Sequence, residues 1–387
     1  MKVALCFGTF PPERNGGSDY VARLAAELAA GGDDVYVVTS AGGGVAREQL
    51  RPGLVIARSV SDWRLTAERR KSLRAVNSAL RTFGADVLHV FFPDSVLQGA
   101  YRIPALIGLS HVPLVTTFWN LGLGRRSPPW VRAEALALLV RSRTLSTHEP
   151  GYLEAIGKLV VRRKAVRWLP VGNNLMDIGA GAEAVMLDGA EWLGYFGQLD
   201  ETRGVEDLFL AVQDLRRVRD VRLVMIGSAG RRERYARDPA SSAYLSRMLA
   251  LPGELGIDRA VVWTDYLPDR RVAAYLRAVD LCVLPYRQNS IGRSALVAAF
   301  EAHAAVVLAG TPETIAPLQA GRHVELAPPA APAQLSATIA RLLSDRPALA
   351  QLRDGAAEAA MMFSWPEIAR RARAIYAEAA AAKASAT

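Results

Sequence analysis

The chain has 387 residues, of which 51% are hydrophobic and 22% are charged, and it carries a formal net charge of +9. This length exceeds the size at which a single hydrophobic core stops growing, so it predicts two domains. No apolar run reaches the roughly 18 to 20 residues that span a bilayer, and no signal-peptide core precedes the first strand, so we expect a soluble, unexported, cytoplasmic protein.

The first half alternates short apolar strands with amphipathic helices. Strands are predicted at residues 2–7, 34–39, 54–58, 86–91 and 113–117, and helices from about residue 19, at 66–83 and at 130–141. The first strand leads into Gly16 and Gly17 and then into a helix. A glycine turn at a helix N-terminus exposes backbone N–H groups, which predicts a place for an anion.

The second half repeats this order. Strands are predicted at residues 191–197, 221–226, 260–264, 281–285 and 305–308, and helices at 205–218, 243–255 and 269–278. Its first strand leads into Arg203 and Gly204. The repeat predicts an α/β protein with two Rossmann-like, doubly wound parallel sheets facing a cleft, with ligands beyond the carboxyl ends of the strands. Residues 173–188, rich in glycine and alanine, are interpreted as the linker.

Basic residues are concentrated in the first half. Residues 125–167 contain ten arginines and lysines against three glutamates, and residues 62–84 are also strongly basic. Such helices suit an anionic membrane surface or a phosphorylated substrate, whereas nucleic acid is not expected because interleaved aromatic residues are lacking. The alternative is a solvated helix face in an arginine-rich protein.

Several ordered motifs resemble those of the GT-B-fold glycosyltransferases of family 4. They include the first glycine loop, the strands that follow it, the entry to the second half and the C-terminus. In chain order they lie at residues 10–19, 86–91, 114–119, 168–174, 195–204, 261–267, 278–280, 283–285 and 363–365. The series covers nearly the whole chain.

The resemblance implies a retaining glycosyltransferase that moves a sugar from a nucleoside diphosphate sugar, its co-substrate, to a glycolipid, polysaccharide or natural product, with no metal ion or other cofactor. It also implies an acceptor-binding domain at residues 1–175, a nucleotide-sugar-binding domain at residues 189–365, and a C-terminal helix at about 366–383 that packs back on the first domain. Cys6 and Cys282 lie in apolar strands and suggest no disulfide, metal site or nucleophile.

Two negative charges on the departing diphosphate have to be stabilised, a task for fixed cations and helix N-termini. The resemblance places Arg203 where the family has its phosphate-binding lysine, and a guanidinium holds two phosphate oxygens at once. Gly16 and Gly17 let the backbone approach the diphosphate. Further substrate contacts are predicted at Asp19, Gly227, Ser228 and Tyr266, the last of them near the base.

The family's paired glutamates are absent, because their positions fall on Ser290 and Ala298. Residues 289–296 are instead similar to a branch of the family with arginine and serine at the start of this helix. We therefore expect Arg293 to act with Arg203 in catalysis. Asn289, Ser290 and Ser294 are predicted substrate contacts, although helix capping alone accounts for Ser294.

Trp119 stands where the family has a histidine near the donor sugar, and we predict a catalytic role for it too. An indole stacks well on a sugar ring, but a tryptophan at a strand end is as often part of the core. Three functions stay open: an active transferase with unusual donor contacts, a nucleotide-sugar-binding partner of another transferase that has lost catalysis, and a GT-B-fold epimerase. The missing glutamates favour the second and Arg203 opposes it, while the third lacks a set of paired acids.

Overall fold

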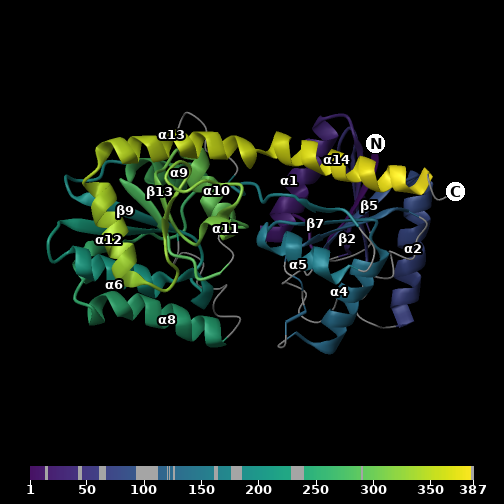
Figure 1. Ribbon diagram of the computed structural model, residues 1–387. Helices are drawn as coiled ribbons and strands as arrows, with labels where there is room; N and C mark the ends of the chain where they lie inside the picture. The colour runs from purple at the N-terminus through teal and green to yellow at the C-terminus, as the bar shows by residue number, and fades with distance from the viewer. Residues whose placement is uncertain are drawn as a thin grey trace. The chain divides into compact units, whose positions relative to one another are not determined.

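The computed structural model describes residues 1–13, 16–41, 46–60, 67–92, 112–119, 121, 123–124, 127–160, 164–175, 185–227, 239–288 and 291–384, without the side chains of 67–73 and 382–384. The chain forms two compact units. Unit 1 comprises Met1–Gly172 and Ser364–Thr387, and unit 2 comprises Asn173–Phe363. Each has a sheet flanked by helices (Figure 1), which confirms the predicted α/β class with two parallel-sheet domains.

The sheet of unit 1 has eight strands in the order β3-β4-β2-β1-β5-β6-β7-β8. All neighbours are parallel except the edge pair β3 and β4, which is antiparallel. The strands are β1 (Lys2–Cys6), β2 (Asp34–Ser40), β3 (Ala46–Arg51), β4 (Leu54–Val60), β5 (Val87–Phe92), β6 (Leu114–Phe118), β7 (Thr144–Thr147) and β8 (Val166–Trp168).

The two faces of this sheet carry separate cores because successive strand side chains point to opposite faces. Val3 and Leu5 of β1 join one core with α1 (Gly16–Ala30) and α14 (Trp365–Ala384). Ala4 and Cys6 join the other, which is covered by α2 (Ala67–Phe83), α4 (Pro129–Arg141) and α5 (Gly151–Leu159).

The C-terminal helix α14 belongs to unit 1 and lies alongside α1 (Figure 1). A buried chain of hydrogen bonds joins it to the sheet. The Tyr376 hydroxyl lies 2.8 Å from His89 Nδ1, and His89 Nε2 lies 2.6 Å from Thr117 Oγ1. A Cβ atom at Gly172 would lie 2.6 Å from the Trp365 ring, so only glycine fits where the chain leaves this sheet.

Unit 2 has a six-stranded parallel sheet in the order β11-β10-β9-β12-β13-β14. Its strands are β9 (Glu191–Phe196), β10 (Val221–Ile226), β11 (Val261–Trp263), β12 (Leu281–Leu284), β13 (Val306–Ala309) and β14 (Glu325–Ala327). Its helices are η1 (Glu201–Arg203), α6 (Val205–Leu215), α8 (Pro239–Glu254), η2 (Asp258–Ala260), α9 (Asp269–Ala278), α10 (Ser294–Glu301), α11 (Pro312–Ile315), α12 (Pro332–Leu343) and α13 (Arg346–Met362).

The structure corrects some expected elements. Strand β3 was not predicted, because its mostly exposed sequence Ala-Arg-Glu-Gln-Leu-Arg lacks the apolar pattern of a buried strand. Strands β7, β8 and β14 are only three or four residues long, too short for a clear period. Helix α1 begins at Gly16 instead of near residue 19, and the helix predicted at 205–218 ends at Leu215, where Arg217 N turns back to Asp214 O.

Candidate functional site

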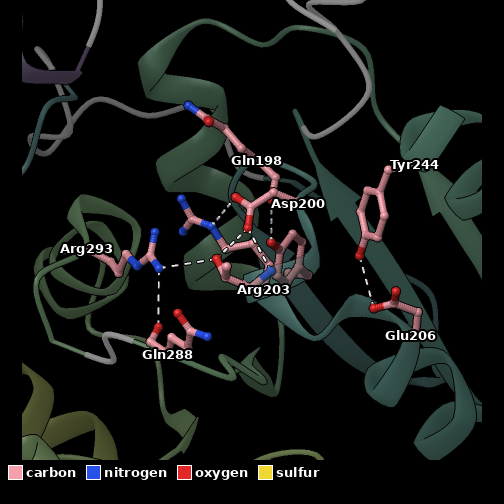
Figure 2. A network of polar contacts seen from close by, with 9 residues as sticks. Gln198, Asp200, Arg203, Glu206, Tyr244, Gln288 and Arg293 are labelled. Atoms are coloured by element: carbon pink, nitrogen blue, oxygen red, sulfur yellow. Dashed lines mark hydrogen bonds and ion pairs between the residues drawn. The ribbon is translucent and has the colours of Figure 1, made fainter. Parts of the chain in front are cut away.

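The predicted phosphate site lies on two segments of unit 2 that follow neighbouring strands. Strands β9 and β12 pair in parallel, with Leu193 opposite Leu281. The segment after β9 carries Arg203, and the segment after β12 carries Tyr286 and Arg293. Parallel strands end at the same sheet edge, which brings Arg203 and Arg293 to one place (Figure 2).

Arg203 is held by a short capped turn. Asp200 caps η1, because its Oδ1 accepts from Thr202 N at 2.9 Å. Its Oδ2 accepts from Arg203 Nε at 3.0 Å, and the arginine side chain is only 12% exposed. The side chain predicted to bind phosphate is therefore fixed and mostly buried, with its Nε already engaged.

Gly204 follows in the left-handed region, with φ of 64° and ψ of 28°. A Cβ atom here would lie 2.0 Å from the carbonyl oxygen of Pro285. The backbone between Arg203 and helix α6 thus passes directly over the end of β12, and both the close approach and the positive φ require glycine.

Arg203 and Arg293 share one aromatic ring. The guanidinium carbons of Arg203 and Arg293 lie 5.4 and 5.6 Å from the centroid of the Tyr286 ring. Arg293 Nη2 also donates to the carbonyl of Gln288 at 3.2 Å and, at 3.4 Å, to Thr202 Oγ1, which ties it to the turn of Arg203 (Figure 2). The structure therefore brings together the two arginines that the sequence proposed.

Neighbouring groups favour the charged forms of Arg203 and Asp200. Burial acts to lower the pKa of Arg203, but the oxygens of Tyr286, Tyr195 and Asp200 outweigh it and raise the pKa above its usual value. Burial likewise acts to raise the pKa of Asp200, yet Arg203 and the Thr202 hydrogen bonds bring it below its usual value. Two guanidinium groups and one carboxylate leave an excess positive charge, which suits a phosphate ligand.

A second polar cluster, which sequence reasoning missed, sits at the start of α6. Arg287 Nε and Nη2 each donate to the Asp207 carboxylate at 3.0 Å. The Tyr244 hydroxyl donates to Glu206 Oε2 at 3.0 Å (Figure 2). The backbone N–H of Arg287 donates to Thr202 O at 2.9 Å, so this cluster supports the same turn. The two acids in the first turn of α6 were the available signal, since they suit a helix N-terminus.

The other candidates of unit 2 fall at strand or helix ends. Gly227 follows β10 with φ of 65°, but its N–H donates to Thr264 Oγ1 at 2.7 Å, so this amide is already occupied. Tyr266 lies beyond β11 and is half exposed. Ser294 begins α10 and does not cap it, because Arg293 holds the N-cap position with no side-chain hydrogen bond, so capping does not account for Ser294. Ser228, Asn289 and Ser290 lie outside the described residues.

In unit 1, Gly16 and Gly17 form the first turn of α1, with Asp19 in the same turn. The positive end of the helix dipole lies at this turn, so the N-terminus of α1 stays a candidate for binding an anion. The contacts that Gly16, Gly17 and Asp19 would make with a ligand stay predictions.

Trp119 packs on the core of unit 1. Its ring centroid lies 5.4 Å from that of Tyr20 and 4.2 Å from that of His148, and its Nε1 is buried without a hydrogen-bond partner. Burial lowers the pKa of His148 to about 4. The structure therefore places Trp119 in an aromatic cluster, in agreement with the core alternative, and it brings a neutral histidine beside the position where the family's own histidine was expected.

Among the described residues, no group of three or more histidine, cysteine and acidic side chains is arranged to hold a metal ion. No helix in the described part of the chain combines the length and the apolar character needed to cross a bilayer.

The chain matches two family models. Residues 14–149 match the model described as Glycosyltransferase Family 4, and residues 190–345 match the model described as Glycosyl transferases group 1. A curated relative is the D-inositol 3-phosphate glycosyltransferase of Corynebacterium efficiens, 28% identical over 199 residues, which are 50% of this chain and 44% of the relative. The matched segments span less than half the length of the curated relatives.

Solved structures match over almost the whole chain. The sucrose-phosphate synthase of Thermosynechococcus elongatus superimposes with a TM-score of 0.75 at 18% identity, covering 98% of this chain and 99% of that one. HepE of Anabaena, solved with UDP, superimposes with a TM-score of 0.71 at 15% identity, covering 96% of this chain and 98% of its own. At these identities the likeness shows the fold.

Proposed function

This chain belongs to the GT-B-fold glycosyltransferases, and we propose that it transfers a sugar from a nucleoside diphosphate sugar to an acceptor with retention of configuration. The donor binds unit 2, and the acceptor, a glycolipid, polysaccharide or natural product, binds unit 1. In this proposal the sugar transfer needs no metal ion. HepE, a structural neighbour, has been solved with UDP and with UDP-glucose, which makes uridine nucleotides the first donors to test.

The observation that carries the proposal is the pair of arginines on Tyr286. As the bond between the anomeric carbon and the diphosphate oxygen breaks, its electrons move onto the diphosphate. Arg203 and Arg293 are already charged and held before the donor arrives, so little reorganisation is needed when that charge develops. A guanidinium also donates two parallel hydrogen bonds to phosphate oxygens, which a lysine cannot match.

The absent glutamates favour a second candidate, a nucleotide-sugar-binding partner without catalysis. Ala298 is buried and apolar, so it accepts nothing from a ribose. On the same helix, Glu301 Oε2 accepts a hydrogen bond from Asn173 Nδ2 at 2.6 Å, so this oxygen is engaged within the protein. Both candidates require a nucleotide site around Arg203, and only turnover separates them.

The test begins with thermal shifts of the parent protein against UDP, GDP, ADP and dTDP and their sugar conjugates, followed by turnover of the stabilising donor. A ligand at a hundred times its dissociation constant adds about 2.7 kcal/mol of stability. Arg203→Ala should lower turnover by roughly a hundredfold to a thousandfold, whereas Arg217→Ala, at an exposed arginine of the same unit, should leave it unchanged.

Absence of any nucleotide shift would contradict both candidates. A shift with no turnover of any donor would support the binding partner over the transferase. Equal turnover in Arg203→Ala and Arg217→Ala would remove Arg203 from the mechanism.

We also propose that unit 1 contacts an anionic lipid surface, at the inner face of the membrane. Helix α4 exposes an apolar face on which Trp130, Leu136 and Val140 are 40%, 51% and 73% exposed. At 100° per residue they fall within about a third of the helix circumference. Exposed Arg141 at the end of α4 supplies positive charge beside this face. An anionic membrane surface binds apolar and basic side chains together.

A further inference from the structure

The ring of Tyr286 lies fully buried at the end of β12, where the chain turns toward Arg287. Arg203 and Arg293 come from segments about ninety residues apart in the chain, yet both guanidinium groups lie within 6 Å of the centre of this ring. A cation at that distance from an aromatic face is attracted by the ring's electron density. Both arginines therefore pack on the ring of this tyrosine.

Two like charges on one ring repel each other, so something has to keep them together before a ligand arrives. Asp200 partly offsets the repulsion, through its ion pair with Arg203 and through Thr202, whose hydroxyl donates to Asp200 and accepts from Arg293. Arg293 Nη2 also donates to the carbonyl oxygen of Gln288 at 3.2 Å. Its attraction to the Tyr286 ring adds a restraint from the side of the ring face.

The phenol hydroxyl is not what orders the group. Tyr286 Oη is buried and has no hydrogen-bond partner of normal geometry, although Arg203 and Arg293 lie near enough to oppose the rise in its pKa that burial causes. A hydroxyl in such a place contributes little, because an unmade buried hydrogen bond is unfavourable. The ring itself is the useful part of the side chain.

We propose that Tyr286 is a positioning residue whose aromatic ring holds Arg203 and Arg293 as a preassembled pair. The inference rests on the proposed function, in which these arginines bind the diphosphate of the donor. It adds the residue that sets their spacing, and it assigns that role to the ring face instead of the hydroxyl.

The test measures how fast phenylglyoxal modifies each arginine of the full-length protein, by peptide mass spectrometry, in Tyr286→Phe and Tyr286→Met. Phenylalanine keeps the ring, so both arginines should react as slowly as in the parent. Methionine fills the space without a ring, so Arg203 and Arg293 should both react faster, by roughly threefold or more. Arg287 is bound to Asp207 and serves as the internal control, with an unchanged rate.

A fluorinated series at position 286 guards against misfolding of the methionine variant. Phenylalanines with one, two and three ring fluorines keep the shape but progressively weaken the attraction of the ring for cations. The rates of Arg203 and Arg293 should rise together with fluorine number while that of Arg287 stays flat. Rates independent of fluorine number, or a rise in only one of the two arginines, would overturn the inference.

Binding of inorganic pyrophosphate, measured by calorimetry on the same proteins, separates this inference from the proposed function. Tyr286→Phe should bind as the parent does, and Tyr286→Met roughly tenfold more weakly. If the parent binds neither pyrophosphate nor any nucleotide while the arginine rates still follow the ring, the proposed function fails and the positioning role stands. If the parent binds and the ring has no effect on the rates, the positioning role fails alone.

Discussion

Replacing Gly204 with alanine tests how the candidate phosphate site is assembled. Its φ of 64° is unfavourable for alanine, and the new Cβ would start 2.0 Å from Pro285 O, whereas real Cβ contacts are essentially never closer than 3.0 Å. The two backbone segments therefore have to separate by at least the difference, 1.0 Å. Pro285 immediately precedes Tyr286, so the movement reaches the ring on which both arginines pack.

Gly256 offers a matched control in the same unit. Its φ is 67°, and a Cβ there would meet nothing within 4 Å. Alanine at either position carries the same backbone penalty, about 1 kcal/mol. Only Gly204→Ala adds the clash, for which forced repacking suggests a further 1 to 3 kcal/mol, about 2 to 4 kcal/mol in total.

Urea unfolding of the parent and the two variants measures this difference, and pyrophosphate binding shows whether the site moves. Gly204→Ala should lose both more stability and more affinity than Gly256→Ala, which should bind as the parent does. Equal losses of stability in the two variants would refute the argument that Gly204 is required by its approach to Pro285.

Two further predictions concern unit 1. Burial is the main cause that lowers the pKa of His89 to about 3 and that of His148 to about 4, against 6.5 in the unfolded chain. The unfolded state therefore binds more protons than the folded state below pH 6.5. Stability should be independent of these groups above pH 6.5 and should fall as the pH drops from 6.5 toward 4, with each histidine costing about 2 kcal/mol by pH 5. Urea unfolding at pH 7 and at pH 5 measures this loss of stability. The His89→Asn variant should lose less stability between pH 7 and pH 5 than the parent does, and an identical loss would contradict a buried, neutral His89. In the second prediction, Leu136→Glu combined with Val140→Asp should abolish binding to phosphatidylglycerol vesicles without lowering the melting temperature, because both side chains are exposed. Met361→Asp, at an exposed residue of unit 2, is the control, and retained vesicle binding by the double variant would argue against α4 as the contact.

The alternation of strands and helices could be predicted from the sequence, because buried parallel strands are short apolar runs and their crossover helices carry a clear 3.6-residue period. Strands β1, β2, β5 and β10 appear within one or two residues of their expected ends. Strand β3 could not be predicted in this way, since an exposed edge strand is stabilised by backbone pairing with β4 and leaves no apolar pattern.

Part of the candidate site could also be predicted from the sequence alone. Arg203, Gly204 and Arg293 stand out because phosphate chemistry demands cations, close backbone approach and helix ends, which local motifs display. Their arrangement was decided by the tertiary structure, since Tyr286, Asp200 and Arg293 meet only when β9 and β12 pair in one sheet. Trp119 shows the same limit, because whether an aromatic ring at a strand end faces a ligand or a core depends on the neighbours that the fold supplies, here Tyr20 and His148.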